Sequence, residues 1–254
     1  IMGNLDVKYL FESQCELIDN IKELLKVLDG KKYGKELERL YEEFIDEIRE
    51  HVYSKKESKK ILVTLYFSLK IIKENLDKNM NIKEENFIII NNENKLLIEE
   101  FMDGIVINAK NEHEENKLKY YGYLLGNLIF KENLDRDESN RLIKISRSLS
   151  YCQIKLINMY IISQMIQVPI LKREDYTKTG IENYRLLGVL QDTLYMIQKS
   201  ILNGSGKLVL DIVQINPSKV KVQGIGTLLY NLMGLSKMPY DEMEDLLDIL
   251  SNKN

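Results

Sequence analysis

The segment 62–76, LVTLYFSLKIIKENL, shows the pattern that decides the fold class of this chain. Its apolar side chains recur at alternating steps of three and four residues, which is the spacing of one face of an α-helix. The members of this stripe are Leu62, Leu65, Leu69, Ile72 and Leu76. A helix with one such face buries it against other elements, so the segment predicts a helix that belongs to a helical core.

Two earlier segments carry the same pattern and extend the prediction toward the N-terminus. Their stripes run over 10–28 and 37–52, and each of the three helices would span about 20 residues, or roughly 30 Å. Short polar connections at 29–34 and 53–58 favour antiparallel neighbours. We therefore expect an N-terminal antiparallel helical bundle over residues 1–80.

The same stripes would also suit a coiled-coil arm, because their spacing is close to a heptad repeat. About three heptads are marginal for a free coiled coil, so the intramolecular bundle is the favoured alternative. Under the other alternative, the N-terminal helices would recruit a protein partner or cause the chain to self-associate. Both alternatives stay open at the level of sequence.

A turn-rich stretch at 77–94 interrupts the helical pattern and is the best candidate for a hinge. It encloses a short apolar run, 87–90, which suits either a strand or the start of a buried helix, since its length does not distinguish them. Helical spacing resumes after Leu96. The predicted division of the chain is a helical bundle at 1–80, a helical middle region at 81–138 and a third region at 139–254.

The composition excludes several classes of protein. With 44% hydrophobic residues among 254, the chain is too apolar to be disordered. No stretch approaches the roughly 18 consecutive apolar residues of a membrane-spanning helix, and the first residues lack the basic and apolar parts of a signal peptide. Cys15 and Cys152 stand far apart without a shared motif, which favours a reducing compartment. We expect a cytoplasmic protein without a membrane partner.

The C-terminal part of the chain follows a different pattern, in which helices are succeeded by short strands. Ser150 is a suitable N-cap for the second of these helices, and alternating residues after a helix breaker at 203–206 predict the strands. The predicted elements, in order, are helices at 137–149, 151–167 and 181–202, strands at 207–213 and 219–222 around a turn at 216–218, and helices at 227–233 and 239–250.

This order of elements resembles a winged-helix domain, a helix-turn-helix variant in which a β-hairpin "wing" follows the recognition helix. The stretch 215–230, in which a strand leads through Gly224 and Gly226 into a helix, is similar to the end of many such domains. The whole chain also resembles a family of helical bacterial proteins of uncharacterised function, a likeness that implies no activity. The expected fold is mainly α: the N-terminal antiparallel helical bundle, followed by a winged-helix-like α+β segment with a short β-hairpin.

The overall balance of 36 basic and 39 acidic residues conceals a partition along the chain. Residues 139–237 carry 13 basic and 5 acidic groups, a net charge of +8, whereas 1–138 and 238–254 are both acidic. A basic segment that coincides with the winged-helix-like one favours nucleic acid as a partner, because cations neutralise phosphates. The alternative is that these charges face the acidic half or a protein partner, since winged helices also act as protein-interaction modules.

In the nucleic-acid interpretation, the contacts come from the helix 181–202 and from the wing 207–222. Amide side chains on the helix would reach base edges, and cations would contact phosphates. Lys219 and Lys221 alternate with valines, so they are predicted to share one strand face. The candidate residues are Lys178, Asn183, Arg185, Gln191, Gln198, Lys199, Lys207, Lys219 and Lys221.

Motifs of catalysis or metal binding do not occur in the sequence. Neither His51 nor His113 lies in an H-E-x-x-H arrangement. The run 112–115 is typical of a solvated helix start, whose acids face the positive end of the helix dipole. The run from Gly204 to Lys207 lacks the first glycine of a phosphate-binding loop, because residue 201 is Ile. We expect no cofactor, no metal and no enzymatic activity.

Overall fold

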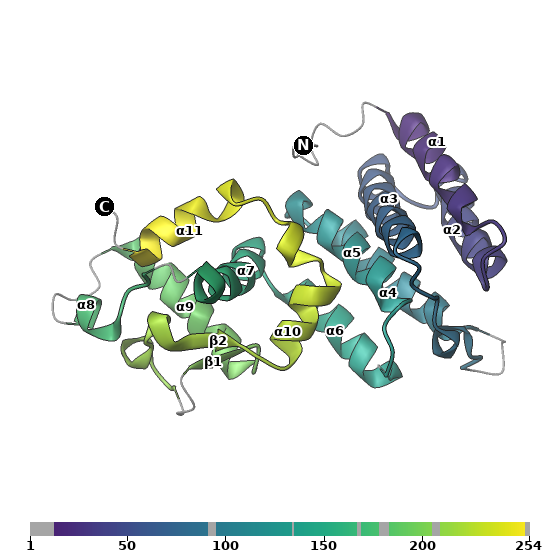
Figure 1. Cartoon of the computed structure of the whole chain (residues 1–254). Helices are drawn as coiled ribbons and strands as arrows, with labels where there is room; N and C mark the ends of the chain where they lie inside the picture. The colour runs from purple at the N-terminus through teal and green to yellow at the C-terminus, as the bar shows by residue number, and fades with distance from the viewer. Residues whose placement is uncertain are drawn as a thin grey trace. The chain divides into compact units, whose positions relative to one another are not determined.

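The computed structural model describes residues 13–90, 95–133, 135–166, 169–177, 183–204 and 209–251. The protein is mainly helical, as the sequence predicts, and it contains one small two-stranded antiparallel sheet (Figure 1). It forms two compact units, residues 1–148 and 149–254, hereafter unit 1 and unit 2. The three-part division expected from the sequence, with boundaries at 80 and 138, stays a prediction about domains.

Unit 1 is built from helices joined by short connections. Its elements are α1 (Gln14–Leu25), η2 (Lys26–Leu28), α2 (Gly34–Arg49), α3 (Lys55–Asp77), η3 (Glu84–Phe87), α4 (Leu97–Asn111), η4 (Glu115–Lys117), α5 (Leu118–Leu128) and α6 (Arg136–Ser148), where η denotes a 3-10 helix. Within the described ranges of either unit, no helix combines the length and the apolar character needed to cross a membrane.

Helix α3, which contains the stripe 62–76, lies at the centre of unit 1. It begins with a capping box, in which the Ser54 hydroxyl accepts from the backbone N–H of Glu57 and the Glu57 carboxylate accepts from that of Ser54. Helices α1, α4 and α5 pack against it (Figure 1). The apolar stripes within α1 and α2, represented by Leu17 and Leu37, are buried inside this unit, whereas Val52, predicted to end the second stripe, lies beyond α2 and is exposed. These stripes therefore serve the core of the unit itself.

Two glycines allow α5 to approach α3 closely. A Cβ atom at Gly122 would lie 2.4 Å from the carbonyl oxygen of Thr64, and one at Gly126 would lie 2.5 Å from that of Ser68. Both distances are far shorter than a van der Waals contact, so only glycine fits at these two positions. The spacing of four residues places both glycines on the same face of α5.

The apolar run 87–90 belongs to the connection between α3 and α4. Phe87 ends the 3-10 helix η3 and stacks on Tyr33, with ring centroids 4.2 Å apart. Ile88 and Ile89 are exposed, and Ile89 pairs with Leu96 in an isolated antiparallel bridge. Neither alternative expected for this run, a strand of a sheet or the start of a buried helix, describes it.

Unit 2 combines helices with the sheet. Its elements are α7 (Tyr151–Ile166), α8 (Arg173–Thr177), α9 (Tyr184–Gln198), β1 (Leu202–Gly204), η5 (Ile212–Gln214), η6 (Pro217–Lys219), β2 (Val220–Val222), α10 (Ile225–Leu232), η7 (Leu235–Lys237) and α11 (Asp241–Ser251). Strands β1 and β2 are antiparallel, and Leu202, Asn203 and Gly204 pair with Val222, Lys221 and Val220. The predicted N-cap is confirmed, because the Ser150 hydroxyl accepts from the backbone N–H of Gln153.

The strand predicted at 207–213 is wrong over its described part, 209–213. The Asp211 side chain accepts from the backbone N–H of Val213 and opens the 3-10 helix η5 instead, a local bond that competes with a sheet ladder. The first strand lies earlier, at β1, because α9 ends at Gln198 and Ser200 turns the chain with φ of 59°. Residues 207 and 208 lie outside the described residues.

Candidate functional site

Asn183 is the N-cap of helix α9, which was predicted to bind a partner. The side-chain oxygen of Asn183 accepts from the backbone N–H groups of Arg185, at 2.9 Å, and Leu186, at 3.3 Å. These two bonds satisfy amide groups that have no partner within the helix. Asn183 was predicted to reach a base edge, and in the structure its side-chain oxygen caps the helix.

One side of α9 is fixed in the core of unit 2. Leu186, Val189, Leu190 and Met196 are buried on this side. Between them lies Thr193, whose hydroxyl donates to the carbonyl of Val189 and lies 3.0 Å from the hydroxyl of Tyr160 in α7. These contacts set the rotation of α9 about its axis, so they also determine which residues face away from the core.

The opposite side of α9 is uncovered. Tyr184, Gln191 and Gln198 follow one another at steps of seven residues and therefore lie along one face. Tyr184 is 81% exposed, and both glutamines are exposed. Gly188 lies on the same face, and a Cβ atom there would meet no other atom within 4 Å. We call these four residues the α9 face.

Tyr184 is the member of the α9 face that sequence reasoning placed wrongly. Helical periodicity over 181–202 predicts Tyr184 on the apolar side of the helix, together with Leu190 and Ile201. In the structure Leu190 and Ile201 are buried and Tyr184 points to solvent. The step of seven residues from Tyr184 to the two polar glutamines was the signal that could have identified it.

The remaining predicted residues are distributed around this helix. Lys199 is exposed at the end of α9, with its ammonium 5.6 Å from the ring centre of Tyr195. Lys221 is exposed in β2, opposite Asn203. Lys219 is exposed too, but it ends η6, so the prediction that it shares a strand with Lys221 is wrong. Lys178 and Lys207 lie outside the described residues.

The charge of unit 2 differs from the charge of the predicted basic segment. The acidic helix α11 belongs to the unit, and Asp245 in it lies 3.8 Å from the guanidinium of Arg185 in α9. Residues 149–254 hold 11 basic and 10 acidic groups, a net charge of +1. Three of the cations counted in the segment 139–237 lie in α6 of unit 1: Arg141, Lys144 and Arg147.

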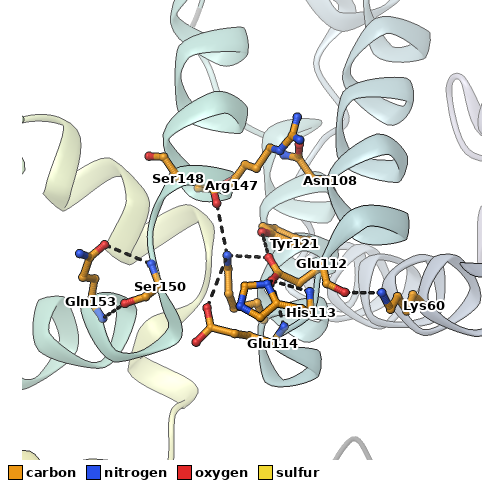
Figure 2. A network of polar contacts seen from close by, with 12 residues as sticks. Lys60, Asn108, Glu112, His113, Glu114, Tyr121, Arg147, Ser148, Ser150 and Gln153 are labelled. Carbon is orange, nitrogen blue, oxygen red and sulfur yellow. Dashed lines mark hydrogen bonds and ion pairs between the residues drawn. The ribbon is translucent and has the colours of Figure 1, made fainter. Parts of the chain in front are cut away.

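The buried charges of the described chain gather in unit 1, where α4 leads through η4 into α5 (Figure 2). One carboxylate oxygen of Glu112 lies 2.6 Å from the ammonium of Lys117 and accepts from the hydroxyl of Tyr121 at 2.5 Å. The other accepts from the backbone N–H groups of His113 and Glu114 at 2.9 and 3.0 Å. The Glu112 carboxylate is therefore saturated with donors.

Two lysines complete this cluster. The ammonium of Lys117 also donates to the backbone carbonyl of Arg147 at 3.3 Å. Lys60 in α3 donates to the carbonyls of Glu112 and Lys110, which lie at the C-terminal end of α4. A helix C-terminus carries partial negative charge, which favours a cation at this position.

The environment shifts the pKa of two groups in the cluster. Burial acts to raise the pKa of Glu112, but the hydrogen bonds from Lys117 and Tyr121 outweigh it, and the pKa lies below its ordinary value. Burial, together with the bond to the Glu112 carboxylate, raises the pKa of Tyr121. Glu112 is thus held as a carboxylate and Tyr121 as a neutral donor.

The cluster is built as an ion pair and does not suit a metal ion. Glu112, His113 and Glu114 place one possible ligand atom each within 4.8 Å of one another. The oxygens of Glu112 already accept four donors, however, and the imidazole of His113 is 91% exposed. The expectation that 112–115 is a solvated helix start is wrong for Glu112, because this residue is buried.

A groove of about 810 Å³ also lies in unit 1, beside the end of α3. Two of its lysines are already paired: Lys32 with Glu84 at 2.8 Å, and Lys83 with Glu132. Among the described residues, its lining contains no histidine or cysteine.

Comparison with known proteins found no match for this chain among family models, curated proteins or solved structures.

Proposed function

We propose that this chain is a non-enzymatic regulatory protein of the cytoplasm, and that unit 2 is a winged-helix-like module whose α9 face contacts a nucleic acid. In this proposal α9 is the recognition helix, and the β1–β2 pair with its connection is the wing. Residues 1–80 of unit 1 form the antiparallel helical bundle that the sequence predicts, and 81–138 form the helical middle region.

The contacts around β2 support the winged-helix-like arrangement. The helix predicted at 137–149 is α6, which belongs to unit 1, so in this proposal the three helices of the module are α7, α8 and α9, followed by the β1–β2 pair. The α7–α8 connection contacts η6, directly before β2, since the backbone N–H of Ser218 donates to the carbonyl of Leu171 at 3.2 Å. Gln164 in α7 donates to the carbonyl of Val220 at 3.0 Å.

The observation that carries the proposal is the uncovered α9 face. A glutamine side chain has both a donor and an acceptor, the combination that pairs with the edge of an adenine. Gln191 and Gln198 are about 10 Å apart along the helix axis, so they would face different base pairs. Exposed cations at Lys199 and Lys221 would contact phosphates.

Fluorescence polarisation with a labelled duplex tests this proposal at about 50 mM salt, where electrostatic binding is strong. The wild-type chain should bind, and binding should weaken as salt is added. The double variant Gln191→Ala, Gln198→Ala should bind more weakly, because each lost pairing costs roughly 1–3 kcal/mol. Asn231→Ala, at an exposed amide in α10, is the control and should bind like the wild type. Absence of duplex binding at low salt would refute the proposal.

A protein-interaction module is the second candidate, and two exposed apolar residues favour it. Leu210 and Val213 are 67% and 45% exposed in the connection between β1 and β2. This connection is held on α8, because the guanidinium of Arg173 donates to the carbonyl of Val213 at 2.6 Å. A net charge of +1 on unit 2 also suits a protein partner. This candidate predicts concentration-dependent association in sedimentation experiments that Leu210→Ser weakens, with no duplex binding.

A further inference from the structure

Helix α6 of unit 1 has one buried side and one charged side. Leu142, Ile143 and the hydroxyl-bearing Ser139 and Ser146 are buried. The rotation of the helix is fixed by Asn108 in α4, whose side-chain amide donates to the carbonyl of Ile143 at 3.0 Å. The apolar side of α6 is therefore already used inside unit 1.

Three cations follow one another on the other side of this helix. Arg141, Lys144 and Arg147 are exposed, and steps of three residues place neighbouring members of the series about 4.5 Å apart along the axis. We call them the α6 cations. They are among the cations that gave the segment 139–237 its excess of positive charge.

No described carboxylate pairs with the α6 cations, and they lie within two turns of one helix. Arg136, at the start of the same helix, is held by both carboxylate oxygens of Glu100. Asp137 and Glu138 lie in the first turn of α6, yet neither forms an ion pair with Arg141 or Lys144. The α6 cations are thus available to an anionic partner.

We propose that the α6 cations bind the phosphate backbone of a nucleic acid. They span about 9 Å of the helix axis, and a strand of duplex DNA presents a phosphate about every 3.4 Å along its own axis. Two or three phosphates therefore fit along this face. The inference rests on the proposed nucleic-acid function, but it uses a surface in the other unit.

The residues around the α6 cations favour a nucleic acid over an anionic membrane as their partner. A helix that lies on a membrane surface inserts its apolar face between the lipids. Of the three large apolar residues of α6, Leu142 and Ile143 are buried against the protein and Ile145 is half-buried. A phosphate backbone needs only the cations, because its contacts are made through charge and hydrogen bonds.

The test compares two double charge reversals that change the net charge by the same amount. The first is Arg141→Glu with Lys144→Glu, and its control is Lys22→Glu with Lys73→Glu, at exposed positions of α1 and α3. The α6 variant should bind a labelled duplex about tenfold or more weakly, with a salt slope that is smaller by about two, one for each lost phosphate contact. In the control, the logarithm of the binding constant should fall by less than a third of its fall in the α6 variant.

Each outcome decides between the two proposals. Equal losses in the α6 variant and in the control overturn the inference, because only the net charge would matter. If the α6 variant binds normally while the Gln191/Gln198 variant does not, the inference fails and the proposed function of α9 stands. The reverse result supports the inference and refutes the role of α9. Absence of duplex binding by the wild type refutes both proposals. If the wild type binds phosphatidylserine vesicles instead, and the α6 variant does not, the partner of the α6 cations is a membrane.

Discussion

Helices α5 and α9 each carry a glycine near the middle, and the two glycines have opposite surroundings. At Gly122 in α5, a Cβ atom would lie 2.4 Å from the backbone of α3, whereas at Gly188 in α9 it would meet nothing within 4 Å. The first helix is enclosed by its neighbours and the second leaves one face open. This difference separates a helix that is packed on its glycine face from one whose glycine face has no neighbour within 4 Å.

The largest expected effect concerns the buried ion pair beside α5. Glu112→Gln removes the carboxylate that neutralises Lys117, and both side chains are nearly inaccessible to solvent. Because the buried ammonium loses its nearest counter-charge and keeps only Glu114 at 4.0 Å, we expect the free energy of unfolding to fall by about 3 kcal/mol. Urea unfolding followed by circular dichroism measures this loss.

Glu43→Gln is the matched control for this substitution. Glu43 pairs with Arg39, but more than half of its side chain is exposed, so its loss should cost less than about 1 kcal/mol. Similar losses in the two variants would show that burial does not set the strength of the Glu112 pair.

The second effect tests the enclosed glycine directly. Gly122→Ala places a methyl group against the backbone of Thr64 and Ser68 and against the Cβ atom of Phe67. Helix α5 must then move away from α3, and overpacking of this kind costs about 1–3 kcal/mol. Thermal and urea unfolding should both report the loss. An alanine that is tolerated without any loss would show that α5 can shift freely along α3.

A third, smaller effect is the pH dependence of the ion pair. The pKa of Glu112 in the folded chain lies below its ordinary value of 4.5. Such a group stabilises the fold above its unfolded-state pKa, and this contribution is lost as the pH falls through the folded-state pKa. The difference in unfolding free energy between wild type and Glu112→Gln should therefore shrink between pH 7 and pH 3. A difference that stays constant over this range would contradict the assigned shift.

The contrast between the two helices also explains how much the sequence could predict. The stripe of α3 was visible because its core contacts follow a local period, and Leu62, Leu65 and Leu69 are fully buried, as expected. The surroundings of Glu112 were invisible in the local pattern, since Lys60, which donates to its backbone carbonyl, is 52 residues away in sequence. The strand expected around Asp211 failed because one side-chain cap outweighed an alternating apolar pattern.

The smallest expected effect has the opposite sign and tests the open helix. Gly188→Ala adds a methyl group where no atom would meet it, and alanine restricts the unfolded chain more than glycine does. Since glycine inside a helix is about 0.5–1 kcal/mol less favourable than alanine, unfolding of the variant should require more urea than unfolding of the wild type. A loss of stability would mean that the α9 face is covered in solution, by the rest of the chain or by another copy. In that case the open helix and the enclosed helix would no longer differ, and the α9 face would be unavailable for a nucleic acid.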